Sequence, residues 1–122
     1  MQIRESGEDY LEAILMIQKR NGQVRSIDIC NELGFSKPTI SVAMKNFREE
    51  GYITVDPDGF IDLTDKGLTI AKRVYERHQI ISEALMALGV SRETALDDSC
   101  KIEHVISEES FLKIKEFLNS KS

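Results

Sequence analysis

Apolar residues in the first fifty positions recur at intervals of three and four in three successive segments. This spacing predicts three amphipathic helices, one ending at Asn21 and two more at residues 26–33 and 36–50. Only about three residues, beginning with Gly34, connect the second helix to the third. Two helices with so short a connection, one that contains a glycine, are typical of a helix-turn-helix.

The pattern after residue 51 changes from helical spacing to short β-branched and aromatic runs. Residues 52–55 and 60–63 have the composition of short strands, and the Asp-Pro-Asp-Gly sequence at 56–59 is typical of a turn. A hairpin placed directly after the second helix of a helix-turn-helix indicates its winged variant.

Helical spacing returns after the hairpin, and residues 64–88, 91–106 and 107–118 are predicted to form three further helices, each opened by a serine or threonine. The predicted fold is therefore mainly α with a small β-hairpin. We expect a winged helix-turn-helix DNA-binding domain at residues 1–63, followed by an all-helical dimerisation domain at residues 64–122.

Composition narrows the class of protein. The 122 residues, 41% hydrophobic and 30% charged, suit one ordinary domain or two small ones that share a long helix. The apolar runs at 13–17 and 84–90 are far shorter than the roughly 20 residues of a membrane span. Charged residues in the first 20 positions argue against a secretory signal peptide, and two cysteines do not make a disulfide scaffold. These features predict a reduced, cytoplasmic protein with no membrane partner.

The three helices expected after residue 64 are too few to bury their apolar faces alone, so we expect a symmetric homodimer. The net charge of −5 argues against a protein that coats nucleic acid without selectivity. If the chain binds DNA, local geometry rather than overall charge must provide the contact.

The start of the second helix of a helix-turn-helix enters the major groove. The polar and basic residues at this place offer hydrogen bonds and positive charge to phosphates and base edges, and the helix N-terminus itself favours a phosphate. The candidates are Ser36, Lys37, Pro38, Thr39, Ser41 and Lys45. Each has a structural alternative, in which Ser36 only caps the helix and Pro38 only fits its first turn.

No arginine or glutamine stands in the first turns of this helix, so the pattern does not name the base sequence of an operator. The predicted wing tip carries Asp56 and Asp58, which indicates a weak grip on phosphate. Docking of a protein is the less common use of a winged helix and is the alternative to DNA binding here.

A second group of residues has the spacing of metal ligands. Cys100, Glu103 and His104 stand at i, i+3 and i+4 and therefore share one helical face. Two acidic residues share a face of the first helix in the same way, and a histidine lies in the long helix. Carboxylates and imidazoles that converge repel or desolvate one another unless a divalent cation neutralises them. The candidate ligands are Asp9, Glu12, His78, Cys100, Glu103 and His104.

These residues also have structural alternatives. A Glu-His pair on an amphipathic helix is usually a surface feature, a buried cysteine usually acts as a small apolar residue, and Asp9 suits the start of a helix. Cys30 lies on the apolar side of the second helix, with no histidine or carboxylate cluster near it in sequence. We interpret Cys30 as a core residue.

Several of these features occur together, in a recognisable order: Glu-Asp-Tyr-Leu-Glu at residues 8–12, the winged helix, the Arg77-His78 pair, and Cys-Lys-Ile-Glu-His at residues 100–104. The chain thus resembles the diphtheria toxin repressor (DtxR) family, and within it the short manganese transport regulator (MntR) branch, over most of its length. The resemblance implies a homodimeric, metal-activated transcriptional repressor that binds palindromic double-stranded DNA operators at promoters of metal-uptake genes.

The resemblance also implies a ligand set. Asp9 and Glu12 match ligand positions of the manganese branch, where the iron-sensing branch has a methionine in place of Asp9. His78, Glu103 and His104 match ligand positions of both branches. The expected cofactor is Mn²⁺ or Fe²⁺, with Zn²⁺ and Co²⁺ as alternatives in vitro.

The chain departs from the family pattern at two ligand positions. Cys100 falls where the manganese branch usually has glutamate and the iron branch has cysteine. A hard oxygen ligand at Asp9 suits manganese, whereas a thiolate favours iron or zinc. The iron branch builds a second site with a glutamate four residues after its histidine, and Ser82 occupies that position here. We expect a short form of the family, without the C-terminal SH3-like domain of longer members.

Two rival functions use the same residues. A winged-helix regulator that senses an organic ligand or oxidation would use Cys100 as a reactive thiol, although the neighbouring Asp97 and Asp98 disfavour its thiolate. A hydrolytic metalloenzyme would need an open coordination position, which six protein ligands do not leave, and an oxyanion-forming loop. We therefore predict a regulator and not an enzyme.

Overall fold

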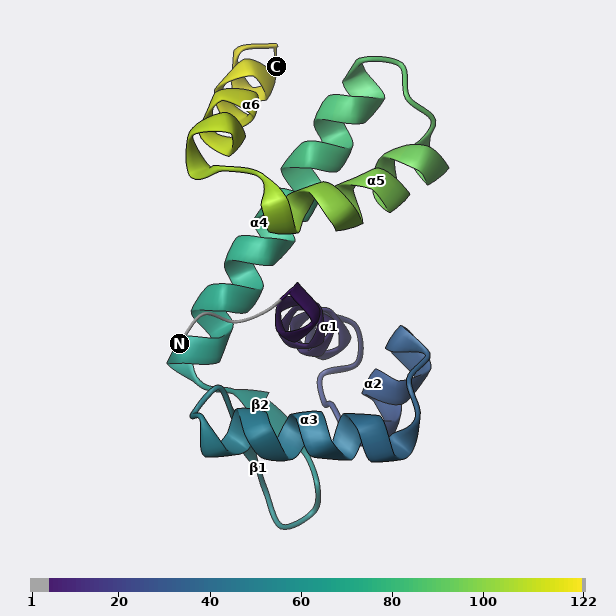
Figure 1. Ribbon diagram of the computed structural model, residues 1–122, viewed down its shortest axis with the longest axis vertical. Coiled ribbons are helices and arrows are strands. Elements are labelled where there is room, and N and C mark those ends of the chain that lie inside the picture. Colours follow the sequence, from purple (N-terminus) through teal and green to yellow (C-terminus); the bar gives the residue numbers. More distant parts are fainter. Residues whose placement is uncertain (1–4, 122) are drawn as a thin grey trace. The chain divides into compact units, whose positions relative to one another are not determined.

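The computed structural model describes residues 5–121, with side chains from residue 7 to residue 120 (Figure 1). The helices and strands are α1 (Glu5–Asn21), α2 (Ser26–Leu33), α3 (Lys37–Glu49), β1 (Ile53–Val55), β2 (Ile61–Leu63), α4 (Asp65–Ala87), α5 (Arg92–Val105) and α6 (Glu108–Lys121). This order confirms the prediction of a mainly helical chain with one hairpin. Within the described range, no helix is long and apolar enough to cross a membrane.

The chain divides into two compact units, Met1–Lys72 and Arg73–Ser122. In the first unit α1 packs against α2 and β2, and α3 packs against α2 and β1 (Figure 1). The largest fully buried side chains in the described part of this unit are all apolar and come from each of these elements and the loop before α2: Leu11, Ile14, Ile17, Val24, Ile29, Ile40, Ile53 and Ile61. The rings of Tyr10, Phe47 and Tyr52 meet edge to face at 5.8 and 6.1 Å, which joins α1, α3 and the start of the hairpin.

The hairpin is antiparallel, with Ile53 opposite Leu63. The loop before α2 adds to it, because the Ile61 N–H donates to the Val24 carbonyl at 2.7 Å. Gly67 fixes how α4 leaves the hairpin, since a Cβ at this position would overlap the carbonyl oxygen of Tyr52. The Thr64 hydroxyl caps α4 as predicted, accepting from the Gly67 N–H at 3.2 Å.

The connection from α2 to α3 has the predicted chemistry. Gly34 takes a left-handed conformation (φ 74°) that few other residues tolerate, and its N–H donates to the Cys30 carbonyl. Ser36 is the cap of α3, and its Oγ accepts from the Thr39 N–H at 3.4 Å. These two signals end one helix and begin the next within three residues, which confirms the helix-turn-helix.

The second unit consists of the greater part of α4 together with α5 and α6. Ser91 caps α5 and Ser107 begins α6, each accepting a hydrogen bond from the backbone N–H three residues later. Its buried apolar side chains are few, namely Val74, Ile81, Ala95 and Phe111. Figure 1 shows α5 crossing α4 within this unit, and this crossing positions the groups described next.

Candidate functional site

The exposed face of α3 carries the residues predicted to contact DNA. Ile40, Met44 and Phe47 are buried on the inner face of α3, while all six candidates at its start and along its outer side are exposed: Ser36, Lys37, Pro38, Thr39, Ser41 and Lys45. The structure thus leaves them accessible to a ligand. It also supports part of the structural alternative, because Ser36 caps the helix and Pro38 lies in its first turn.

The hydroxyl groups of Ser36 and Thr39 are hydrogen-bonded to each other at 2.9 Å. Each therefore retains only part of its capacity for a phosphate or base. Ser41 and the two lysines are the more available members of the set. The helix α3 carries three basic residues, Lys37, Lys45 and Arg48, against one acidic residue, Glu49, although the whole chain carries a net charge of −5. The surface of α3 is locally basic.

The turn of the hairpin accounts for one of its two acidic residues. The carboxylate of Asp56 accepts hydrogen bonds from the N–H groups of Asp58 and Phe60, both at 2.9 Å. Asp56 therefore stabilises the turn. The guanidinium of Arg25 lies 4.3 Å from the centre of the Phe60 ring, which places a positive charge next to the hairpin.

The helical unit brings four predicted metal ligands together where α5 crosses α4. His78 Nδ1 lies 3.0 Å from Glu103 Oε2 and 3.9 Å from the Cys100 sulfur. His104 Nε2 lies 3.5 Å from the other oxygen of Glu103. One imidazole nitrogen, two carboxylate oxygens, a second imidazole nitrogen and a thiol sulfur therefore lie in one small region. The i, i+3, i+4 spacing predicted this for Cys100, Glu103 and His104, and the crossing of α4 and α5 adds His78.

Glu103 is the centre of this group. Its side chain is 0% exposed and that of His104 is 1% exposed. Oε1 of Glu103 is buried and accepts no hydrogen bond in the described part of the chain. A buried carboxylate oxygen without a donor is costly, and one common explanation is a cation that the oxygen ligates. Nitrogen, oxygen and sulfur donors suit a first-row divalent transition metal. The residues present thus fit such an ion.

Arg77 holds the end of α5 in place, a role that sequence analysis missed. Its guanidinium donates to the carbonyls of Glu103 and Ile106 at 3.3 and 3.0 Å and to the Glu108 carboxylate at 2.8 Å. Carbonyls at a helix C-terminus lack partners within the helix, and a cation there satisfies them. The only sequence signal was the position of Arg77 next to His78.

A buried pair of hydroxyl groups adjoins His78. The Ser82 hydroxyl donates to the His78 carbonyl at 2.7 Å and lies 2.7 Å from Ser99 Oγ. Ser99 Oγ in turn lies 3.3 Å from His78 Nδ1 and 3.0 Å from the Leu96 carbonyl. Ser82, which occupies the position of the second-site glutamate, is thus engaged in packing α4 against α5. Sequence analysis also missed Ser99, because a serine inside a helix has no distinctive pattern.

Asp9 and Glu12 belong to the other unit and lie three residues apart on α1. Glu12 is 8% exposed, a low value for a carboxylate, and Asp9 is half-buried. Because residues three positions apart on a helix share one face, Asp9 and Glu12 lie on the same face of α1, as predicted. Cys30 is buried in the first unit, as predicted for a core residue.

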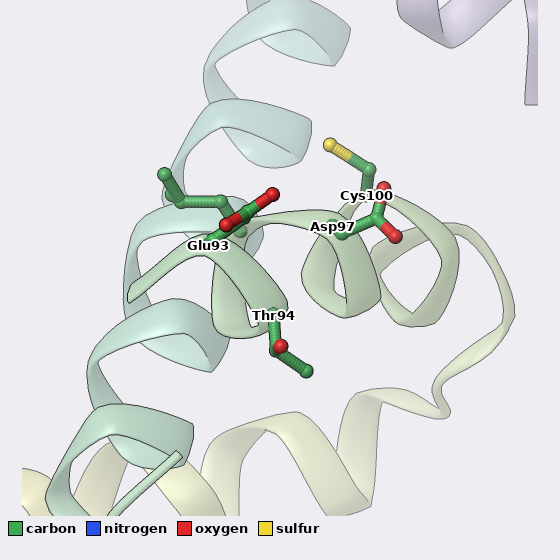
Figure 2. Close-up of a pocket in the computed structure, with 5 residues that line it drawn as sticks. Glu93, Thr94, Asp97 and Cys100 are labelled. Carbon is green, nitrogen blue, oxygen red and sulfur yellow. The ribbon is translucent and has the colours of Figure 1, made fainter. Parts of the chain in front are cut away.

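A pocket of about 570 Å³ lies beside α5, lined by Glu93, Thr94, Leu96, Asp97 and Cys100. Figure 2 shows the labelled side chains of Glu93, Thr94, Asp97 and Cys100 projecting in different directions. Because these groups do not converge, the pocket does not form a second ligand cluster. Cys100 connects this exposed surface with the His78–Glu103 group.

Comparison with known families accounts for both units. The N-terminal DNA-binding domain of the iron-dependent repressors matches residues 2–60, and their metal-binding and dimerisation domain matches residues 64–121. The chain therefore belongs to the DtxR/MntR family of metal-dependent, DNA-binding transcriptional repressors. This family consists of transcriptional regulators, which confirms the prediction that the chain is not an enzyme.

Individual relatives agree with this assignment. The transcriptional regulator MntR of Escherichia coli O6:H1 is 37% identical over 107 residues, which cover 88% of this chain and 69% of that protein. An uncharacterised HTH-type transcriptional regulator of Methanocaldococcus jannaschii is 32% identical and covers 93% of both chains. The solved structure of the manganese regulator SloR superposes with a TM-score of 0.80 at 26% identity. The match covers 98% of this chain and 55% of SloR, so the chain spans about half the length of that relative.

The two matched domains define the coarse function. A DNA-binding domain and a metal-binding dimerisation domain in one chain imply a DNA operator, a homodimer and a divalent metal ion.

Proposed function

We propose that this chain is a cytoplasmic repressor of metal-uptake genes that responds to Mn²⁺ or Fe²⁺ and binds a palindromic operator as a homodimer. The observation that carries the proposal is the Glu103 carboxylate, fully buried between His78 and His104 with one oxygen that accepts no hydrogen bond. The names of the MntR and SloR relatives support manganese as one of the two candidate metals.

The proposed ligands come from both matched domains. His78, Cys100, Glu103 and His104 form the part of the set that lies in the helical unit. Asp9 and Glu12 would complete it from α1, supported by their spacing and by the burial of Glu12. We propose that the boundary between the two domains lies at residues 63 and 64. The family matches, which end at residue 60 and begin again at residue 64, support this place, whereas the two compact units divide later, between Lys72 and Arg73 within α4.

The bound cation would supply the positive charge that offsets the buried carboxylates. Glu103, held by His78 and His104, would then no longer carry an uncompensated charge. Asp9 and Glu12 lie on the helix against which α2 packs, so their engagement would bias the orientation of the DNA-binding unit. In a two-fold dimer this orientation would set the distance between the two α3 helices. That distance must match the spacing of the operator half-sites, which is one turn of the DNA helix or a multiple of it.

Metal and operator must promote each other's binding by the same factor if both favour one conformation, typically by about 1–3 kcal/mol. Alanine variants of His78 and Glu103 test this coupling. Both should lose metal-dependent operator binding while the metal-free protein stays folded, because each removes a polar side chain and leaves the apolar core of both units unchanged. Equilibrium dialysis against Mn²⁺, Fe²⁺ and Zn²⁺ measures the metal affinity, and fluorescence anisotropy of labelled duplex DNA measures operator binding with and without each metal.

Glu93→Gln is the matched control, because Glu93 is an exposed acidic residue of the same helix. It should retain the metal affinity and the DNA response of the parent. If His78→Ala or Glu103→Ala binds DNA with the parent's metal requirement, the proposed ligand set is wrong.

Cys100 is the residue that we expect to decide between metals. A thiolate is a soft ligand, whereas a carboxylate at the same position suits manganese. Cys100→Glu should therefore shift activation of DNA binding towards Mn²⁺ and away from Zn²⁺. An unchanged order of metals would show that the sulfur, although 3.9 Å from His78 Nδ1, does not coordinate.

A further inference from the structure

Val42 is an exposed apolar residue in the middle of α3. It is 61% exposed, more than any other large apolar side chain in the described part of the first unit. Most apolar residues of that unit are buried, and those of α3 itself, Ile40, Met44 and Phe47, face its core. The exposure of Val42 therefore sets it apart within its own helix.

Helical geometry places Val42 opposite the core. It stands two positions after Ile40 and two positions before Met44, which rotates it by about 200° from each at roughly 100° per residue. Within the outer face it stands one turn after Pro38 and about one turn before Lys45. The side chain is thus at the centre of the surface that α3 presents outward.

Local stability gives no reason for a valine here. A β-branched residue is a weaker helix former than alanine, and an exposed methyl group gains nothing from the core. The charged residues of α3 are Lys37, Lys45, Arg48 and, at its C-terminal end, Glu49, so the helix carries a net positive charge. An apolar side chain inside a basic helical surface matches the major groove of DNA, where phosphates flank the base edges.

We infer that Val42 is a specificity-determining residue that packs against the 5-methyl group of a thymine. The thymine methyl is the only apolar group that the bases present in the major groove, and a small apolar side chain is suited to it. The neighbouring candidates are lysines, hydroxyl residues and a proline, so Val42 supplies the large exposed aliphatic group of this surface. The inference rests on the proposed function, since it requires that α3 enters DNA.

The test starts from a duplex library with a randomised 20-base-pair core, selected with Mn²⁺-loaded and with metal-free protein. The best duplex of the enriched motif is then synthesised with each thymine in turn replaced by deoxyuracil, which removes the methyl group alone. One thymine in each half-site should lose about fourfold in affinity, as expected for one buried methyl group. Replacing both should lose about fifteenfold in the dimer.

Val42→Ala separates this contact from general effects of the methyl group on DNA shape. The variant should bind the thymine duplex more weakly and should discriminate less than twofold between the thymine and deoxyuracil duplexes. Ile27→Ala is the matched control, because Ile27 is an exposed β-branched residue of α2. It should retain the full fifteenfold discrimination. Thermal unfolding of both variants should match that of the parent.

The outcomes distinguish this inference from the proposed function. A library that yields no metal-dependent motif overturns the proposed function and the inference with it. A metal-dependent motif in which no thymine is sensitive to deoxyuracil, or in which Val42→Ala keeps the parent's discrimination, overturns the inference alone.

Discussion

The two units of this chain bury different kinds of side chains. The first unit has a core of apolar residues from five of its elements, and the single carboxylate buried in the described part of that unit is Glu12. The described part of the second unit buries four apolar residues together with the polar side chains of Ser82, Ser99, Glu103 and His104. Burial of apolar area stabilises a unit without any partner, whereas buried polar groups need partners of their own.

The apolar residues of the second unit are correspondingly exposed. Leu88, Leu112 and Phe117 are each at least 46% exposed. A groove of about 350 Å³ between α4, α5 and α6 is lined mainly by aliphatic side chains and Phe117. We therefore expect the first unit to be stable without a partner, and the second to gain part of its stability from dimerisation and from a bound cation.

The largest expected effect is a loss of stability of the first unit. Ile14→Ala removes a fully buried side chain and should cost about 2–5 kcal/mol, because a cavity remains in the core. The stabilisation that added metal provides should be the same as in the parent, since no proposed ligand is changed. Urea unfolding with and without Mn²⁺ measures both quantities. Ile27→Ala, at an exposed position, should cost less than about 0.5 kcal/mol.

The next effect concerns the exposed apolar groove. Phe117→Ala should weaken the homodimer, because Phe117 is half exposed in one subunit and lines the groove. Burial of half a phenylalanine is worth about 1 kcal/mol, so the two subunits together should lose about thirtyfold in dimer affinity. Sedimentation equilibrium checks this change, with Val42→Ala as the control. A dimer constant equal to the parent's would place the interface elsewhere.

A smaller effect tests the buried hydroxyl pair. Ser99→Ala removes the hydroxyl that lies between Ser82 and His78, and groups that orient a ligand typically contribute about tenfold or more to metal affinity. The Co²⁺ absorption spectrum should also change, since it reports ligand geometry. Thr94→Ala, at an exposed position of the same helix, should change neither. Parent-like affinity and spectrum in Ser99→Ala would exclude a positioning role.

The smallest effect lies on α3. Lys37→Ala should weaken DNA binding about equally for all sequences and lower the slope of log affinity against log salt by about one, since one phosphate contact is lost. Anisotropy titrations at several salt concentrations measure the slope. Lys113→Ala, on α6, should leave it unchanged. A parent-like slope in Lys37→Ala would remove Lys37 from the phosphate contacts.

Local sequence signals predicted much of the site. The i, i+3, i+4 spacing of Cys100, Glu103 and His104 was sufficient to predict that these three side chains lie on the same side of α5, because a helix fixes which side chains share a face. The sequence alone left the approach of His78 to Glu103 a hypothesis, since this approach depends on the crossing of α4 and α5. The Ser82–Ser99 hydroxyl pair and the role of Arg77 could not be predicted, because an isolated serine or arginine does not belong to a periodic sequence pattern.

The sequence by itself determined the elements, their order and the residue types that carry function. Hydrophobic periods, caps at Ser36 and Ser91 and the glycine at position 34 are local properties, and local geometry follows from them directly. Only the tertiary structure decided that Glu103 is buried between two histidines and that Val42 faces outward at the centre of a basic surface. Burial and proximity arise from segments far apart in the chain, and no pattern within one segment can specify them.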